Sequence, residues 1–284
     1  MDKLQTILAK LRGSEDTFEE MTPKEFEQFK VDSLNGTEGE LHKKDGYNCK
    51  VCKNKGYIVK LQELPNGHFT QVMTDCKCAE ARRSILRMKK SGLKDVIKDF
   101  TFDKYEVTEP WQNTIKTAAK AYSEHPEGWF YMGGQSGSGK TFICVAICRE
   151  FLLNGRRVVY MSWREDVAVL KGLAMEPEER EKLINKFKRT EVLYIDDLFK
   201  DGKGEDGRRK LPTSADVRLA FEIINYRYNN PKLLTLISSE WSVDELLDID
   251  EAIGGRIFER AGSNGFNISP DRAKNYRTKK MVTL

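Results

Sequence analysis

The sequence predicts an α/β fold built on a central parallel sheet. Two observations lead to this prediction: four short, mostly apolar segments are separated by stretches long enough to form helices, and the first segment runs directly into a glycine-rich loop. The apolar segments are residues 129–132, 157–161, 191–195 and 233–238. Such runs are typical of strands that helices cover on both faces, as in a parallel sheet.

Length and composition indicate a folded globular protein. The chain has 284 residues, of which 39% are hydrophobic and 32% charged. Its longest strictly apolar run, residues 142–148, is far shorter than the roughly 20 residues of a membrane-spanning helix. No signal peptide is recognisable, so we expect a cytoplasmic protein without a membrane partner. In that compartment the six cysteines favour thiol or metal chemistry over disulfides.

The glycine-rich loop predicts a nucleotide site. Residues 133–142 read GGQSGSGKTF, and Gly134–Thr141 fit the pattern G-x-x-x-x-G-K-[ST]. Glycines let successive backbone N–H groups surround phosphates at the start of the following helix, here expected over 141–155. Lys140 is then expected to reach the β- and γ-phosphates, and the Thr141 hydroxyl to bind Mg²⁺. The loop residues expected to hold the phosphates are Gly134, Gln135, Ser136, Gly137, Ser138 and Gly139.

Two acidic residues complete the predicted site. Residues 192–197 read VLYIDD, an apolar strand that ends in Asp196 and Asp197. We expect Asp196 to bind Mg²⁺ and Asp197 to orient or deprotonate the attacking water. The strand over 233–238 ends near Ser239, where a polar group would touch the γ-phosphate or the water. The chain contains no N-K-x-D guanine-recognition sequence, which favours ATP over GTP.

Arg256 and Arg260 lie four residues apart in the segment GGRIFERAG, and therefore on one helical face. Two interpretations are open. An arginine presented to a neighbouring subunit's ATP would stabilise charge on the transferring phosphoryl group. Alternatively, the two side chains form a solvated basic face.

Four cysteines predict a structural zinc site within a module of residues 46–79. Cys49 and Cys52 form a C-x₂-C pair, and Cys76 and Cys78 a C-x-C pair, joined by a hairpin-like stretch with PNG at its tip. Two close pairs from distant points suit tetrahedral zinc, and four thiolates leave no open position for catalysis. Because C-x-C is unusually tight, His68 is an alternative ligand. Redox or disulfide chemistry is the other interpretation.

The remaining segments have simpler features. Residues 1–12 predict a short amphipathic helix, and a second helix is expected to begin after the N-cap Thr22. A basic helix is expected over 80–98, which has seven basic and two acidic residues, and the segment 271–284 has five basic and one acidic. These segments either contact a polyanion or balance the acidic residues 14–45. The stretch 200–214 is expected to be an exposed loop.

Together these motifs resemble the DnaC/DnaI-type replicative helicase loaders, a branch of the AAA+ ATPases, and most of all their DnaI-like and phage-encoded members. The resemblance covers nearly the whole chain. It rests on the cysteine quartet, FTFDKY (100–105), the glycine loop, LYIDDLFK, EIINYRYNN, TLISSE and the stretch from GGRIFERAG to NYR.

The resemblance implies an AAA+ P-loop NTPase domain over residues 99–284. Before it, residues 1–98 would form a helicase-interaction region with the zinc module and a basic linker helix. It further implies ATP-dependent loading of the replicative hexameric DNA helicase onto single-stranded DNA, with ATP, Mg²⁺ and Zn²⁺ as cofactors and self-association through the ATPase domain. Hydrolysis is expected to be slow and stimulated by DNA or the partner. The alternatives are an ATP-gated DNA-binding adaptor and a transposition-helper ATPase.

Roles are carried over by position. Lys140 and Thr141 match Walker A, Asp196 and Asp197 match Walker B, and the sensor-1 region matches residues 238–240. Arg256 or Arg260 would be the finger supplied in trans, and Arg277 is a candidate sensor-2 arginine. Many AAA+ proteins have Glu at the position of Asp197, so the shorter side chain is consistent with slow hydrolysis or a switch-like role.

Overall fold

The computed structural model describes residues 21–90, 99–202 and 209–278. The helix predicted over residues 1–12 lies outside this part of the chain. By contacts the described residues form two compact units, one of residues 21–40 and 50–76 and the other of residues 41–49 and 77–278. Residues 91–98 are not described, so a domain boundary at residue 98 stays a prediction.

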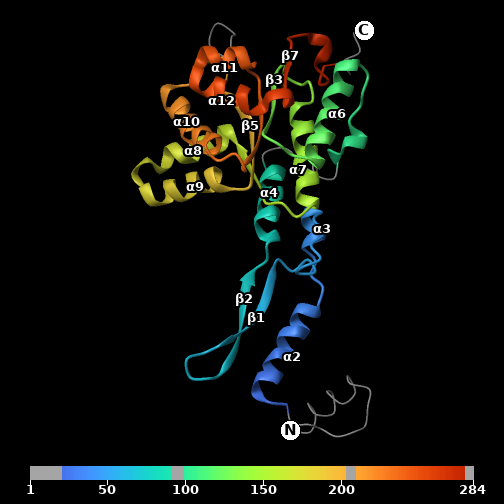
Figure 1. Ribbon diagram of the computed structural model, residues 1–284, viewed down its shortest axis with the longest axis vertical. Coiled ribbons are helices and arrows are strands. Elements are labelled where there is room, and N and C mark those ends of the chain that lie inside the picture. Colours follow the sequence, from blue (N-terminus) through green and yellow to red (C-terminus); the bar gives the residue numbers. More distant parts are fainter. Residues whose placement is uncertain (1–20, 91–98, 203–208, 279–284) are drawn as a thin grey trace. The chain divides into compact units, whose positions relative to one another are not determined.

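The first unit consists of helix α2 (Pro23–Gly36) and an antiparallel hairpin of β1 (Tyr57–Glu63) and β2 (Phe69–Asp75) (Figure 1). Thr22 caps α2, as the sequence predicts, and the structure adds a capping box with Glu25. The side-chain amide of Asn35 fastens the helix to the hairpin, because it accepts from Val59 N at 3.0 Å and donates to Val59 O at 2.8 Å. The Lys55 ammonium binds the carbonyl oxygens at the end of α2, which the helix itself leaves unpaired.

The second unit contains a five-stranded parallel sheet with the strand order β4-β5-β6-β3-β7. The α/β fold with a central parallel sheet is therefore confirmed. The strands are β3 (Trp129–Gly134), β4 (Val158–Ser162), β5 (Val192–Leu198), β6 (Leu234–Ser239) and β7 (Gly265–Ile268). All but β7 were predicted from their apolar runs.

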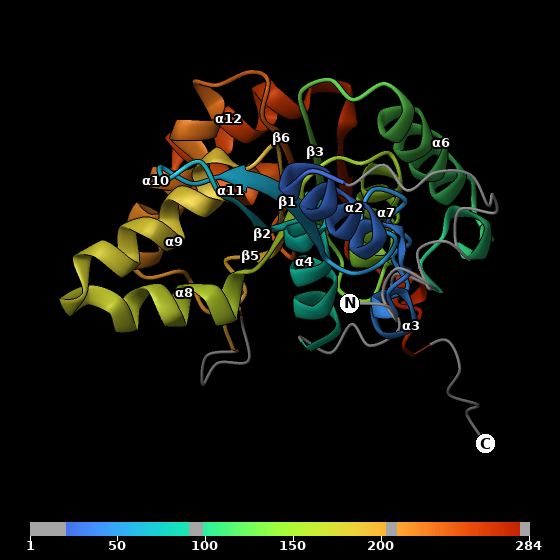
Figure 2. The same cartoon turned by 90° about the horizontal axis from the view of Figure 1, so that it is seen from below.

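Helices cover both faces of this sheet, and the two faces have separate hydrophobic cores (Figure 2). One face packs against α4 (Cys78–Lys90), α6 (Pro110–Glu124) and α7 (Lys140–Leu153). The other packs against α8 (Trp163–Gly172), α9 (Pro177–Arg189), α10 (Ser214–Tyr228), α11 (Val243–Ile249) and α12 (Glu251–Ala261). Alternate residues of one strand serve the two cores: Phe130 and Met132 face the first, Trp129 and Tyr131 the second.

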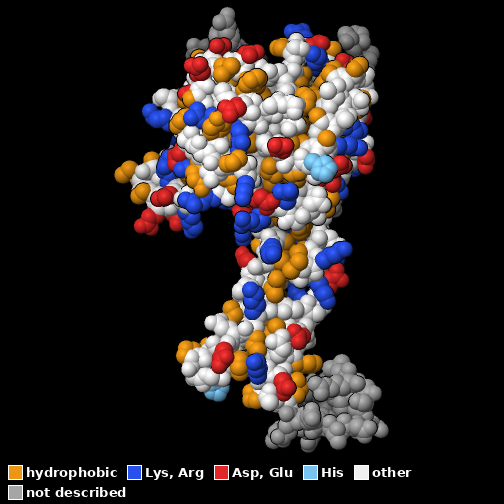
Figure 3. Space-filling view, viewed as in Figure 1, with side chains coloured by type: hydrophobic (Ala, Val, Ile, Leu, Met, Phe, Trp, Pro, Cys, Tyr) orange, Lys and Arg blue, Asp and Glu red, His pale blue; other side chains and the backbone are white. Residues whose placement is uncertain are grey.

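Short elements complete the second unit. They are α3 (Leu41–Asp45) and the 3₁₀ turns η1 (Phe102–Lys104), η2 (Leu173–Met175), η3 (Gly262–Asn264) and η4 (Arg272–Lys274). None of the helices within the described ranges is long and apolar enough to cross a membrane. On the face drawn in Figure 3, Lys and Arg side chains are interspersed with Asp and Glu.

Arg227 is an unexpected part of the second core, since its side chain is completely buried on α10. Five hydrogen bonds satisfy its guanidinium, and their acceptors are carbonyl or hydroxyl oxygens of Phe187, Lys188, Thr190, Leu234 and Thr235. Burial lowers the pKa of Arg227. This arginine links α10 to the end of α9 and the start of β6. Its position within a predicted helical segment gave no indication of this role.

Candidate nucleotide site and cysteine cluster

The glycine-rich loop connects the end of β3 to the start of α7, in the predicted order of strand, loop and helix. Gly134, Gly137 and Gly139 have positive φ angles of 95°, 73° and 92°, which favour glycine. At Gly137 space matters too, because a Cβ atom there would collide with the side-chain oxygen of Asn275. The backbone N–H groups of the loop therefore lie at the positive end of the α7 dipole, as an anion site requires.

A segment near the C-terminal end of the described chain packs on this loop. Tyr276 N donates to Gly137 O at 3.0 Å, and Gln135 N donates to Ile268 O at 2.9 Å. The backbone N–H of Asp271 binds the side-chain oxygen of Gln135 at 3.1 Å. The residues that hold the phosphate loop thus come from a stretch more than 130 positions away, and only Arg277 of this stretch was singled out from the sequence.

Lys140 is buried at the first position of α7. Its ammonium donates to Gly134 O at 2.8 Å and to Gln135 O at 2.7 Å, so it lies across the phosphate loop. Burial lowers the pKa of Lys140 to about 8. The side chain therefore remains mostly protonated at neutral pH and can serve as a phosphate-binding cation.

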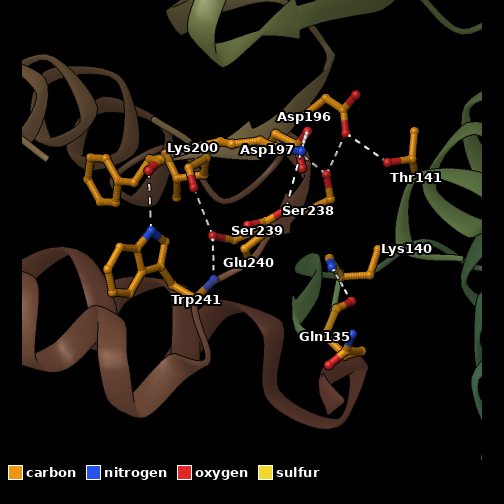
Figure 4. Close-up of polar contacts among 12 residues, drawn as sticks. Gln135, Lys140, Thr141, Asp196, Asp197, Lys200, Ser238, Ser239, Glu240 and Trp241 are labelled. Carbon is orange, nitrogen blue, oxygen red and sulfur yellow. Dashed lines mark hydrogen bonds and ion pairs between the residues drawn. The ribbon is translucent and has the colours of Figure 1, made fainter. Parts of the chain in front are cut away.

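The Asp196 carboxylate is the centre of a hydrogen-bond network at the end of β5 (Figure 4). It accepts from Thr141 at 3.2 Å, from Tyr160 at 2.9 Å, and from Tyr194 and Ser238, both at 2.6 Å. The two predicted Mg²⁺ ligands, Thr141 and Asp196, are thus brought together from different elements. The hydroxyl donors from β4, β5 and β6 hold the carboxylate in place.

Asp197 follows with a positive φ angle of 58°, where the pairing of β5 with β6 becomes irregular. Its backbone N–H donates to Ser238 Oγ at 3.0 Å, and its carboxylate lies 2.8 Å from the Lys200 ammonium. Burial and the neighbouring Asp196 raise the pKa of Asp197, while Lys200 opposes the rise. Asp197 lines the same cavity as Lys140 and Thr141.

The predicted phosphate and metal residues line one cavity of about 540 Å³. At one end are Lys140, Thr141, Asp196, Asp197, Lys200 and Glu240. The wall also includes aromatic residues, among them Phe100 and Phe142, whose rings stack with centroids 4.3 Å apart. Arg277 lines the cavity as well. A polar end beside the glycine loop and stacked aromatic rings suit a nucleotide's phosphates and base.

The three sensor candidates at the end of β6 have different surroundings. Ser238 binds Asp196, and Glu240 lines the cavity. Ser239 is buried, and its hydroxyl donates to Leu198 O at 2.8 Å and accepts from Trp241 N at 3.1 Å. The structure therefore brings Ser238 and Glu240 to the site, whereas Ser239 holds the backbone.

The four cysteines form a cluster in which all four sulfur atoms lie within 4.8 Å of one another and all four side chains are buried. Thiolates around tetrahedral zinc would be about 3.8 Å apart. Backbone and side-chain donors lie beside the sulfurs: Gly56 N is 3.2 Å from Cys52 Sγ, and Arg82 Nε is 3.3 Å from Cys78 Sγ. His68 is exposed in the turn between β1 and β2 and is not a member of the cluster. This donor set fits a metal held by the four cysteines alone.

Comparison with known proteins identifies the family. No protein-family model matches the chain. The phage-like element PBSX protein XkdC of Bacillus subtilis (strain 168) is 30% identical over 227 residues, which are 75% of this chain and 79% of XkdC. The replicative helicase loader DnaC of Escherichia coli (strain K12) is 26% identical over 113 residues, 38% of this chain and 46% of DnaC. The chain belongs to the DnaC/DnaI-type helicase-loader family.

A crystal structure of a DnaC helicase loader superposes on this family member with a TM-score of 0.49 and 21% identity, and covers 62% of this chain and 98% of the other. The sequence match to the E. coli DnaC spans less than half of that protein. The parallel sheet, with the glycine-rich loop between β3 and α7, has the strand, loop and helix order that the resemblance implied.

The two arginines that were candidates for the finger supplied in trans lie outside the cavity. Arg256 and Arg260 are both on α12, and neither belongs to the cavity lining. Arg256 donates to Asn225 Oδ1 at 3.1 Å and to Ala252 O at 2.8 Å. Arg260 stacks over the Tyr228 ring at 5.8 Å, but its buried Nε and Nη2 atoms have no hydrogen-bond partner within the described residues.

Sequence analysis of this loader-family chain missed several residues of the site. Tyr160 belongs to an apolar strand and reads as a core residue, although its hydroxyl binds Asp196. Asn275 and Tyr276 belong to the NYR motif, in which a role was predicted for Arg277 alone. Lys200 lies three residues after Asp197. A basic residue so close to two carboxylates in the sequence could have indicated an ion pair in the site.

Proposed function

We propose that this protein is an ATP-dependent loader of the replicative hexameric DNA helicase onto single-stranded DNA during replication initiation. The observation that carries the proposal is the assembled phosphate and metal site of Lys140, Thr141 and Asp196 in a member of the helicase-loader family. A family member with this site intact would use ATP to time its binding to the helicase and its release.

ATP and Mg²⁺ fit the residues of the cavity. The phosphates would lie on the N–H groups of the glycine loop beside Lys140, and Thr141 and Asp196, whose oxygens are 3.2 Å apart, would hold Mg²⁺. Mg²⁺ would neutralise charge that develops on the phosphates. In hydrolysis a water oxygen bonds to the γ-phosphorus as the bond to the β–γ bridging oxygen breaks. Asp197 would orient that water and take up its proton.

Zinc is the metal that we propose for the four cysteines. The cluster is buried and consists of four thiols, which leaves no position for a reacting water. Its role would be structural: zinc would stabilise a segment too small to form a large core of its own. The first unit, with α2 and the hairpin, would belong to the part that contacts the helicase.

We infer that the ATPase unit self-associates and that Arg260 enters the neighbouring subunit's site. The Nε and Nη2 atoms of this half-buried side chain have no hydrogen-bond partner within the described residues, so a movement of the guanidinium toward an acceptor in a second copy would break no hydrogen bond of theirs. Arg256 has acceptors within its own chain and fits the role less well. ATP between two copies would then couple nucleotide binding to assembly.

This assignment predicts complementation between two inactive variants. Asp196→Asn should lose hydrolysis but still present Arg260, and Arg260→Ala should keep its own site but lack the finger. Each alone should hydrolyse ATP about 10²-fold or more slowly than the wild type with DNA and helicase present, and an equimolar mixture should recover part of the activity. Arg256→Ala is the matched control and should stay within several-fold of wild type. A mixture that stays as inactive as its components would contradict a role in trans.

Native mass spectrometry tests the helicase partnership. The protein is mixed with the replicative hexameric helicase of its presumed host, in the presence of ATP or of ADP. We expect a complex of defined stoichiometry with several copies per hexamer, whose abundance depends on the nucleotide. No complex with either nucleotide would reject the loader and favour the ATP-gated DNA-binding adaptor or the transposition-helper ATPase.

A further inference from the structure

Lys200 is a charged residue of the cavity that ends the LYIDDLFK segment, and its sequence position alone assigned it no role. Its ammonium lies 2.8 Å from Asp197 Oδ2 and 3.3 Å from Glu240 Oε1, so it bridges the carboxylates that follow β5 and β6. Burial opposes protonation, but the hydrogen bond to Asp197 raises the pKa of Lys200. The side chain is therefore a cation at neutral pH.

The backbone around Lys200 is held firmly in place. Phe199 has a positive φ angle of 60°, and its buried ring packs edge-on against Trp163 with centroids 5.3 Å apart. The Phe199 carbonyl accepts from the Trp241 indole N–H at 3.2 Å, and Lys200 N donates to Asp197 O at 2.9 Å. These contacts fix the point from which the Lys200 side chain extends into the cavity.

Charge balance at this end of the cavity gives Lys200 a function. The carboxylates of Asp196, Asp197 and Glu240 lie near the ammonium groups of Lys140 and Lys200, and the cavity lining also includes Glu106, Lys104 and Arg277. Without Lys200, Asp197 and Glu240 would lose the ammonium group that forms an ion pair with each of them, and a phosphate group entering there would be repelled more strongly. Mg²⁺ would offset Asp196, but Asp197 and Glu240 would still need a cation.

The position of Lys200 also selects one phosphate. The aromatic residues Phe100 and Phe142 suit the base, and the glycine loop receives the phosphate chain. The chain would end beside Thr141, Asp196 and Asp197, at the polar end where Lys200 lies. ATP would place its terminal phosphate there, whereas ADP would have no group at that point.

We propose that Lys200 is a second phosphate-binding cation, which neutralises Asp197 and Glu240 in the absence of nucleotide and transfers to the terminal phosphate when ATP binds. The inference rests on the proposed ATP site and adds to it a residue that distinguishes ATP from ADP. Release of Asp197 from Lys200 in the same step would leave its carboxylate available to the attacking water.

Direct binding measurements with the full-length protein test the proposal. The affinities of the non-hydrolysable ATP analogue AMPPCP and of ADP, each with Mg²⁺, are measured for the wild type and for Lys200→Met. Loss of one charge-assisted hydrogen bond should weaken AMPPCP binding about tenfold or more, while ADP binding should change by no more than about twofold. Lys200→Arg should keep most of the preference for AMPPCP.

Lys210→Met is the matched control, because Lys210 belongs to the same loop and lies 3.5 Å from Asp201 in an exposed ion pair. It should leave both affinities unchanged. An equal loss for AMPPCP and ADP in Lys200→Met, or no loss for either, would overturn the proposal. If Lys200→Met does not fold, Lys200→Gln replaces it with the same expectations. A wild-type protein that binds neither nucleotide would instead reject the proposed ATP site itself.

Discussion

Replacing Lys140 with alanine is expected to abolish ATP binding at cellular nucleotide concentrations. The ammonium is buried at the start of α7 and donates to Gly134 O and Gln135 O, the carbonyls next to the expected phosphate position. Two charge-assisted hydrogen bonds to phosphate oxygens are worth about 3–5 kcal/mol, so the affinity should fall roughly 10²–10⁴-fold. Isothermal titration calorimetry with AMPPCP measures the loss.

The control for this variant is Lys182→Ala, an exposed lysine of α9 whose ammonium lies 3.7 Å from Glu179. It removes the same charge from the protein without touching the cavity, and its affinity should equal that of the wild type. The thermal midpoint of Lys140→Ala should show a folded protein. If folded Lys140→Ala binds AMPPCP as tightly as the wild type, the glycine loop is not the nucleotide site.

Replacing Cys76 with serine is expected to eliminate binding of the proposed zinc ion and to destabilise the hairpin beside the cysteine cluster. Cys76 directly follows β2, and its backbone N–H donates to Gly56 O at 2.9 Å in the loop that carries Cys52. Structural zinc contributes on the order of 10 kcal/mol to the folding of small sites, far more than the hairpin's own contacts supply. Zinc content should fall from about one ion per chain to near zero, and limited proteolysis should cut within residues 57–75.

His68→Ala is the control, because this exposed histidine was the alternative ligand and is not a member of the cluster. Its zinc content and protease resistance should match those of the wild type. The cavity lining contains none of the four cysteines, so Cys76→Ser should keep its AMPPCP affinity within several-fold. Full zinc content in Cys76→Ser, or its loss in His68→Ala, would contradict a metal held by the four cysteines.

Local patterns explain what the sequence could predict. The strands β3, β4, β5 and β6 are mostly apolar runs buried on both faces, and such runs are visible without any partner. The spacing of the glycines before Lys140 and the position of Asp196 at the end of an apolar strand are each typical of few kinds of site. The two cysteine pairs were sufficient to predict the cluster, because a metal site needs close pairs rather than a known fold.

Contacts between distant segments explain what remained hidden. Strand β7 has only four residues, and its pairing with β3 depends on the chain returning after α12. Tyr160 and Asp196 are 36 positions apart, and Gly137 meets Asn275 only because β7 places that segment beside the phosphate loop. No local pattern separates such residues from ordinary core or loop positions. The buried Arg227 is the extreme case, since a basic residue in a helix usually faces solvent.

Loading of the helicase onto DNA tests the central claim most directly. The replicative hexameric helicase is incubated with closed circular single-stranded DNA, which it cannot thread from an end, and DNA-bound helicase is separated by gel filtration. With the wild-type protein and ATP, we expect helicase to accumulate on the circles, and Lys140→Ala should leave it near the level seen with helicase alone. Equal amounts of DNA-bound helicase with and without the wild-type protein would contradict the proposed function.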